Sequence, residues 1–333
     1  RLILKGSFKN GVQHIINYME RKKIDLNNQY ILKEKLAQEK WDGILVGNVD
    51  LLDHEILVPL TESGFPVLHH IGFTDPPFDS LHMPRANNYQ IVAASEAVKD
   101  GLTKNQMADQ LTPIIYPGAR VELFGRKATK RSLPAIPDGS ISKPLCIAFA
   151  GLLMSTKGLH TLIEAIVILH LKGVHTRTLI AGASFQKNYQ TVLENFLAQN
   201  GIKETVIFTG DLSRKKLARF FRLNHVFVFP SIYPEAFGIV QAEAMASGLA
   251  LITSGVGGSI ELLDQGRNGF HFTKGDPEDL ANKLKYLADY PSLIERLGEH
   301  SEILANEKFS VMNSAKKLEE LFLENSIKKI IEL

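Results

Sequence analysis

The chain has 333 residues, of which 44% are apolar and 22% charged, so it can bury the cores of two domains. Its 38 basic and 36 acidic side chains leave a formal net charge of +2, which does not favour a nucleic-acid binder with a clustered basic surface. No apolar run approaches the roughly 18 residues of a membrane-spanning helix. The one cysteine, Cys146, cannot form an internal disulfide, and it fits a buried thiol in a reducing cytoplasm.

The first 127 residues predict an irregular α/β half of the chain. Residues 1–8 alternate as a strand does, and the apolar side chains from Val12 to Met19 recur at the helical period. The patterns that follow predict a strand over 44–46, a helix over 51–60 and a strand over 65–71.

The strand over 65–71 ends in a pair of histidines, His69 and His70. Successive strand residues point to opposite faces of a sheet, so one of the two would reach a site at the end of the strand. Histidine serves structural and functional roles equally well here, and both interpretations stay open.

The rest of this half predicts a strand and a helix start over 90–98, where Ser95 would cap the helix, and a last strand with a glycine turn over 114–120. From Arg126 to Pro144 the chain is first basic and then rich in Pro, Ser and Gly, without periodicity. That composition predicts a linker between two domains.

The second half begins with an apolar strand over 145–150 and a glycine turn at Gly151. Further elements are predicted as a helix over 159–171, strands over 177–182 and 206–210, and a helix over 215–223. Strands that alternate with helices predict parallel sheets covered on both faces. Ligands of such sheets bind outside the carboxyl ends of the strands.

The stretch from Val226 to Gly258 predicts one strand–helix–strand unit. Two carboxylates, Glu235 and Glu243, flank the start of its helix. The free N–H groups and the positive dipole end of a helix bind phosphate, and the carboxylates would accept hydrogen bonds from hydroxyls on either side of a diphosphate. This pattern fits a nucleotide-sugar. Each glutamate taken alone is more typical of a complement to the helix dipole, although the small apolar neighbours of Glu243 imply burial and weaken that alternative for it.

The run from Pro234 to Phe272 closely resembles the nucleotide-binding segment of the retaining family 4 glycosyltransferases of the GT-B fold. The resemblance rests on an acidic residue before Phe-Gly, on Glu-Ala-Met-Ala-x-Gly, on Gly-Gly-x-x-Glu and on a late Asn-Gly. The matching residues are Glu235, Phe237, Gly238, Glu243 to Ala246, Gly248, Gly257, Gly258, Glu261 and Asn268-Gly269.

The resemblance implies two Rossmann-like domains whose parallel sheets face an interdomain cleft. It places an acceptor-side domain at 1–127, a linker at 128–144 and a nucleotide-sugar-binding domain at 145–315, with a C-terminal helix over 316–333 that joins the first domain. Because the chain begins with Arg1 and this first half is short for such an enzyme, we expect a fragment that is incomplete at its start.

For the donor, the resemblance implies a motif Gly-Arg-Leu, three residues, Lys-Gly. Gly151 and Lys157 match it, but Leu152 stands where the family has an arginine that clamps the diphosphate, which puts full activity in doubt. The family also implies that Leu212 contacts the base, while a hydrophobic staple before the next helix is the alternative. The helix N-terminus, with Phe237, Gly238 and Ile239, would bind the diphosphate.

For catalysis, the resemblance implies that Glu235 holds the hydroxyls of the donor sugar, Glu243 the ribose, and Lys157 the leaving diphosphate. It also implies that His69 or His70 reaches the sugar from the other domain, although Gly72 stands where the family often has a second histidine. No Asp-x-Asp motif stands at a strand end, in agreement with a site that uses no metal.

The function implied is a retaining, metal-independent transfer of a hexose-like sugar from a UDP, GDP or ADP donor, without a cofactor. The acceptor would be a hydroxyl of a glycan, a lipid-linked molecule or a small molecule. Two alternatives stay open, a non-catalytic nucleotide-sugar-binding or assembly subunit and a nucleotide-sugar epimerase. We expect a cytoplasmic protein, and peripheral contact of the C-terminal helix with the inner face of a membrane stays open.

Overall fold

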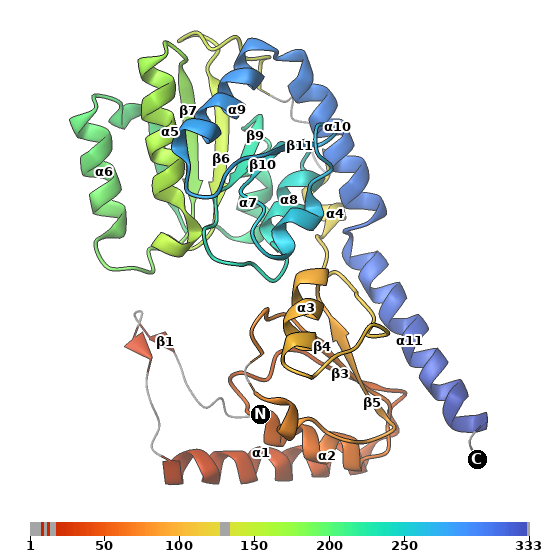
Figure 1. Ribbon diagram of the computed structural model, residues 1–333. Coiled ribbons are helices and arrows are strands. Elements are labelled where there is room, and N and C mark those ends of the chain that lie inside the picture. Colours follow the sequence, from red (N-terminus) through yellow and green to blue (C-terminus); the bar gives the residue numbers. More distant parts are fainter. Residues whose placement is uncertain (1–7, 10–11, 14–17, 77, 127–133, 332–333) are drawn as a thin grey trace. The chain divides into compact units, whose positions relative to one another are not determined.

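The computed structural model describes residues 8–9, 12–13, 18–76, 78–126 and 134–331, and the statements below concern these residues. The chain divides into two compact units, residues 1–116 with 314–333, and residues 117–313. Each unit contains a parallel sheet with helices packed on it (Figure 1). The α/β class predicted from the sequence is therefore confirmed.

The larger unit contains a six-stranded sheet in the order β11-β10-β9-β6-β7-β8, and every neighbouring pair is parallel. Its strands are β6 (Leu145–Ala150), β7 (Thr176–Ala181), β8 (Val206–Gly210), β9 (Val226–Phe229), β10 (Ala250–Thr253) and β11 (Gly269–His271). The winding direction reverses at β6, which pairs with β7 on one side and with β9 on the other. Open parallel sheets bind ligands beyond the strand ends at such a switch point.

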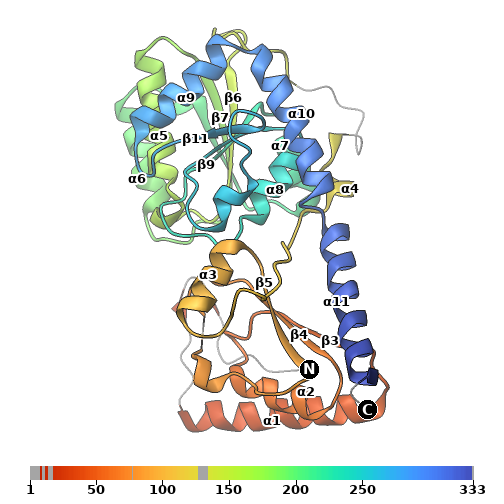
Figure 2. The ribbon, with the colours of Figure 1, turned by 45° about the vertical axis from the view of Figure 1, so that its right-hand side comes forward.

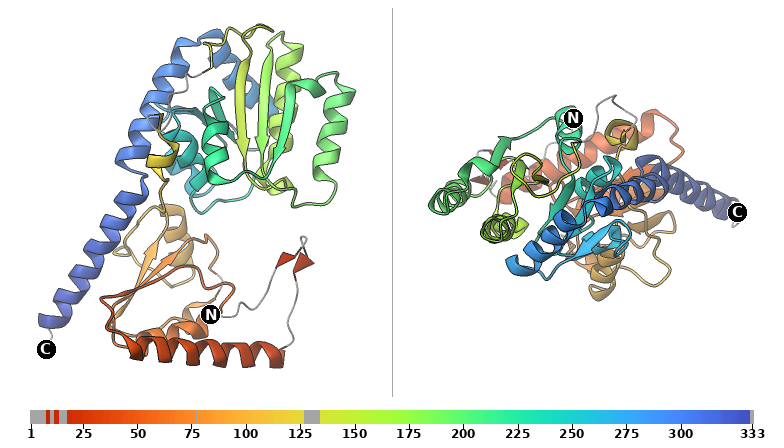
Figure 3. Two further views of the ribbon diagram at one scale, coloured as in Figure 1. Left: turned by 180° about the vertical axis from the view of Figure 1, so that it is seen from behind. Right: turned by 90° about the horizontal axis from the view of Figure 1, so that it is seen from above.

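Helices cover both faces of this sheet (Figure 3). They are α4 (Val121–Phe124), α5 (Leu159–Leu171), α6 (Tyr189–Gln199), α7 (Arg214–Phe221), α8 (Ile239–Ala246), α9 (Pro277–Asp289) and α10 (Ser292–Glu307). The side chains of β9 alternate accordingly. Val226 and Val228 belong to the core shared with α5 and α9, whereas the ring of Phe227 lies 5.5 Å from that of Phe221 in α7.

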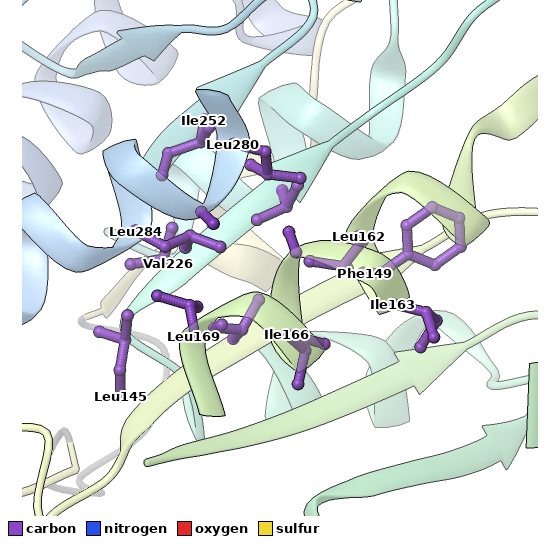
Figure 4. Packing of buried hydrophobic residues seen from close by; sticks show 14 of the residues in the cluster. Leu145, Phe149, Leu162, Ile163, Ile166, Leu169, Val226, Ile252, Leu280 and Leu284 are labelled. Atoms are coloured by element: carbon purple, nitrogen blue, oxygen red, sulfur yellow. The ribbon is translucent and has the colours of Figure 1, made fainter. Parts of the chain in front are cut away.

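The core of the larger unit lies between the sheet and the helices α5 and α9 (Figure 4). Helix α5 contributes an almost fully buried apolar surface, because its Leu and Ile side chains recur at the helical period. Leu162 and Ile166 of α5 contact the same cluster as Leu280 and Leu284 of α9. This packing fixes the strand ends from which the loops of the site arise.

The smaller unit contains a three-stranded parallel sheet in the order β3-β4-β5. Its elements are α1 (Tyr18–Gln38), β3 (Ile44–Val46), α2 (Leu57–Glu62), β4 (Val67–Ile71), β5 (Tyr89–Ala93) and α3 (Glu96–Lys104). Helices α1 and α2 cover one face, and the second half of α11 (Val311–Ile331) covers the other, where Phe322 packs near Leu68 (Figure 2). The predicted cap is confirmed, because Ser95 Oγ accepts a hydrogen bond from the Val98 N–H at 3.1 Å.

The start of the chain differs from its prediction. Instead of a helix over 12–19, Val12–Gln13 pairs antiparallel with Phe8–Lys9, and α1 begins at Tyr18. The pairing joins Lys9 to Val12 across the sequence Asn-Gly, which is typical of two-residue hairpin connections. The rest of the strand predicted over 1–8 lies outside the described residues.

The predicted domain limits stay a prediction. Part of the predicted linker, 128–133, lies outside the described residues. The helix predicted over 316–333 begins earlier in the structure, at Val311. Among the described residues, no helix is long and apolar enough to cross a membrane.

We expect Leu162→Ala to lower the free energy of unfolding by about 2–5 kcal/mol, because Leu162 is fully buried and its truncation leaves a cavity. Leu171→Ala, at the exposed end of the same helix, is the matched control and should change it by less than about 0.5 kcal/mol. Urea unfolding of both variants measures the difference. Equal losses would contradict the assignment of α5 to the core.

Candidate functional site

An ion pair lies where the loops after β6 and β9 meet. Lys157 Nζ lies 2.7 Å from Oε1 and 2.9 Å from Oε2 of Glu235. The buried Ser231 Oγ donates a further hydrogen bond to Oε1 at 2.6 Å. Both side chains of the ion pair are only partly exposed, so the Glu235 carboxylate is held in one place by three hydrogen bonds.

Close backbone approaches hold these loops together. Gly158 has a φ of +67°, and a Cβ there would lie 1.8 Å from the Pro230 carbonyl oxygen. Beside this contact, the Ile232 N–H donates to the Thr156 carbonyl at 2.9 Å. On the other side, the Gly258 N–H donates to the Glu235 carbonyl at 2.7 Å, and a Cβ at Gly257 would lie 2.3 Å from that oxygen. Positions 158 and 257 therefore require glycine.

The second carboxylate, Glu243, lies on α8 and is only 3% exposed. Its Oε1 forms an ion pair with Arg214 Nη1 from the first turn of α7, and no described residue forms a hydrogen bond to its buried Oε2. Burial raises the pKa of Glu243 from its ordinary value of 4.5 to about 7, although the charges of Arg214 and Arg120 oppose this rise. A buried carboxylate oxygen without a donor is costly, so it favours a ligand that brings a hydroxyl.

Glu243 lines a cavity of about 410 Å³ beyond the carboxyl ends of β6 and β7. The lining comes from the turns after β6, β7 and β8 and from the first turns of α7 and α8. It consists of Ala150, Gly151, Leu152, Ala181, Gly182, Ala183, Asp211, Leu212, Arg214, Leu217, Ile239, Val240 and Glu243. The cavity therefore lies at the switch point of the sheet, and its volume is typical of small-molecule sites.

Four of the predicted donor residues, Gly151, Leu212, Ile239 and Glu243, line this cavity together. Lys157, Glu235, Phe237 and Gly238 do not appear in its lining. Phe237 is 2% exposed and packs on Phe309, with ring centroids 5.7 Å apart, so its side chain belongs to the core. Gly238 has a φ of +103° and begins α8, which places the first N–H groups of that helix.

The two candidate histidines belong to the smaller unit and both have protein partners. His69 is 1% exposed, its Nδ1 lies 2.7 Å from Tyr89 Oη, and burial lowers its pKa to about 4. His70 Nε2 lies 2.6 Å from the Ile115 carbonyl oxygen, and burial lowers its pKa too. Both imidazoles are therefore neutral at pH 7, and a catalytic role for either stays a prediction.

Sequence reasoning missed Arg214 and Ser231, although both contact the predicted glutamates. The sequence did contain one signal for Arg214. Arg214 begins a helix whose first turn carries Lys215 and Lys216 and no acidic residue. The positive end of a helix usually carries acidic side chains instead. Within the described part of the chain, no group of three or more His, Cys, Asp or Glu side chains is arranged to hold a metal ion.

Solved structures that share this arrangement include glycosyltransferases of the GT-B fold. A glycosyltransferase from Rickettsia africae matches with a TM-score of 0.76 at 19% identity, over 94% of this chain and 84% of that one. HepE from Anabaena, solved with UDP, matches with a TM-score of 0.73 at 19% identity, over 91% of this chain and 82% of that one. The predicted GT-B fold is confirmed.

Residues 137–303, half of the chain, match the family described as Glycosyl transferases group 1, and the chain belongs to this family. One relative, the D-inositol 3-phosphate glycosyltransferase of Streptomyces bingchenggensis, is 30% identical over 63% of this chain and 47% of its own length. Another, the capsular polysaccharide biosynthesis glycosyltransferase CapM of Staphylococcus aureus, is 27% identical over 70% of this chain and 60% of its own length. The chain spans about half the length of the curated relatives that it matches first.

We expect Gly158→Ala to destabilise the protein more than Gly173→Ala. Both residues flank α5 with similar φ values, +67° and +76°, so both variants carry the left-handed strain of about 1–2 kcal/mol. Only at Gly158 would the new Cβ also meet a backbone oxygen, because no atom lies within 4 Å of the Cβ position at Gly173. Urea unfolding measures both. Equal destabilisation would show that the contact with Pro230 is not tight.

We expect the free energy of unfolding to fall as the pH rises from about 4.5 to about 7 because of Glu243. The folded state holds the proton of this carboxyl up to about pH 7, whereas the unfolded chain releases it near 4.5, so the folded state binds more protons in this window. The slope from one group reaches at most about 1.4 kcal/mol per pH unit. In Glu243→Gln this contribution should be absent.

Urea unfolding of the wild-type protein and of Glu243→Gln at a series of pH values measures this difference. Because burial causes the shift, the difference should persist in about 0.5 M salt, which screens exposed charge pairs. Parallel pH profiles of the two proteins would contradict the burial of this carboxyl.

Proposed function

We propose that the chain binds a nucleotide-diphosphate sugar and transfers its hexose-like sugar, with retention and without a metal ion, to a hydroxyl acceptor. The observation that carries this proposal is Glu243, whose buried Oε2 has no hydrogen-bond partner among the described residues and which lines the cavity at the switch point of the sheet. A ribose brings two adjacent hydroxyls, which supply the donors that this carboxylate lacks.

The start of α8 supports the position of the diphosphate. The backbone at Gly238 and Ile239 presents the first N–H groups of the helix, and Ile239 lines the cavity one helical turn before Glu243. A phosphate bound there lies next to a ribose held by Glu243, as in other helix N-terminal phosphate sites. HepE of Anabaena, which shares the fold, has been solved with UDP and with UDP-glucose. UDP is therefore the first donor to test, beside GDP and ADP.

The Lys157–Glu235 pair supports the chemistry at the sugar. Glu235 keeps a fixed carboxylate in front of α8, which we assign to the hydroxyls of the donor sugar. The bond between the anomeric carbon and the phosphate oxygen breaks with its electron pair on the diphosphate. Lys157 and the helix N–H groups then stabilise that negative charge, which is electrostatic catalysis by groups already in place. A role for His69 or His70, each as a neutral imidazole, stays a prediction.

The acceptor is a hydroxyl of a glycan, a lipid-linked molecule or a small molecule. Its oxygen bonds to the anomeric carbon, and its proton passes to the oxygen of the leaving diphosphate. The relatives' names include a D-inositol 3-phosphate glycosyltransferase and a capsular polysaccharide enzyme, so the family serves acceptors of different size. The cytoplasmic location inferred from the single cysteine stays a prediction.

We expect one of UDP, GDP and ADP, or its sugar conjugate, to raise the thermal unfolding temperature by several degrees. A ligand at about 100 times its dissociation constant adds about 2.7 kcal/mol to the folded state. The shift should vanish in Glu243→Ala, which removes the carboxylate proposed to accept hydrogen bonds from the ribose. It should persist in Glu204→Ala, because Glu204 is exposed and lies outside the cavity lining. No shift with any nucleotide in the wild-type protein would overturn the proposed donor site.

A further inference from the structure

The cavity raises a question of charge, because it is proposed to hold a diphosphate. Leu152 occupies the turn after β6 and lines the cavity with an apolar side chain that is 42% exposed. Among the described residues that line the cavity, Asp211 and Glu243 are acidic and Arg214 is the one cation. Lys157 does not appear in this lining and forms an ion pair with Glu235. Arg214 is therefore the cation placed to bind an anion inside the cavity.

Arg214 stands at a helix end where the dipole disfavours a cation, and the buried Glu243 is its anionic partner there. It is the first residue of α7, followed by the exposed Lys215 and Lys216, and no acidic residue lies in this turn. The positive end of the helix dipole disfavours cations at these positions. A negatively charged ligand in the adjoining cavity is attracted both by Arg214 and by the positive end of the helix, and these attractions offset the cost of the basic first turn.

The contact between Arg214 and Glu243 leaves the guanidinium free to form further bonds. Its side chain is 58% exposed, while that of Glu243 is 4% exposed, so the arginine is the partner that can move. A guanidinium carries five N–H donors in one plane and binds phosphate oxygens in pairs. When Arg214 turns to a phosphate, both oxygens of Glu243 become available to the two hydroxyls of a ribose.

We propose that Arg214 is the second cation of the donor site, binding the diphosphate in place of the arginine that Leu152 replaces. Donor binding then exchanges the Arg214–Glu243 ion pair for an Arg214–phosphate contact and hydrogen bonds from ribose to Glu243. This inference rests on the proposed function, because it assigns a residue to the same donor.

The test compares nucleoside diphosphates with nucleosides by titration calorimetry, using UDP with uridine, GDP with guanosine and ADP with adenosine. Arg214→Gln should weaken binding of the diphosphate about 10- to 100-fold, the usual effect of a lost charged hydrogen bond, and change binding of the nucleoside less than about threefold. Lys215→Gln, in the same helical turn but outside the cavity lining, is the matched control and should change neither.

A second variant, Leu152→Arg, restores the arginine of the family motif. In the Arg214→Gln background it should recover most of the lost affinity for the diphosphate and leave the nucleoside unaffected. Arg214→Gln should therefore cause a smaller loss of diphosphate affinity in the Leu152→Arg protein than in the wild-type protein. The comparison of the wild-type protein, the two single variants and the double variant keeps the test valid if one variant alone is disturbed. Unchanged binding of the nucleoside shows that the site is still folded.

Two results would overturn the inference while the proposed function stands. In one, Arg214→Gln weakens nucleoside and diphosphate equally, so that the arginine acts only on the nucleoside or on Glu243. In the other, it weakens neither. If the wild-type protein binds no nucleotide, the donor site itself is refuted, and the role of Arg214 with it.

Discussion

The donor half of the site depends on a backbone contact too close for any side chain. The turn after β6 touches the segment after β9 at Gly158 and Pro230, and that segment is in turn bonded to the loop after β10 at Glu235 and Gly258. The loops that follow the neighbouring strands β6, β9 and β10 thus form one connected layer beyond the strand ends. The Lys157–Glu235 ion pair forms within this layer, so neither side chain has to be ordered when a ligand arrives.

A second constraint comes from α8, which carries Glu243 into a buried position. The helix is built mainly from small residues, and Ala242 and Ala244 beside Glu243 are fully buried. Its carboxyl end meets α10 so closely that a Cβ at Gly298 would lie 2.2 Å from the Gly248 carbonyl oxygen. The carboxylate therefore cannot move out to water, and its pKa rises as a result. A buried carboxylate oxygen without a donor among the described residues costs stability at this position, a cost that is common at binding sites.

Much of the larger unit could be predicted from the sequence, because β6, β9 and α5 are almost entirely apolar segments whose burial decides their structure locally. Helix α1 could not be predicted in this way, because its few apolar residues, such as Leu32 and Leu36, are only partly buried. They are buried to that extent by packing beside α2, which the sequence pattern does not show. Contacts between residues far apart in the sequence could not be predicted either. His69 meets Tyr89 from 20 positions away, and Arg214 meets Glu243 from 29 positions away. Such pairs exist only once the sheet has brought the strand ends together.

The role proposed for Arg214 illustrates why a departure from a family motif at one residue is weak evidence about function. The cavity is formed by the turns after β6, β7 and β8 together with the beginnings of α7 and α8, so several separate segments supply its groups. An electrostatic site requires a charge at a point in space, and a long arginine side chain can reach that point from any of these segments. Leu152 removes the cation from one segment, while the basic first turn of α7 supplies one from another. The charge of the site is therefore a property of the cavity and not of the loop that the motif describes.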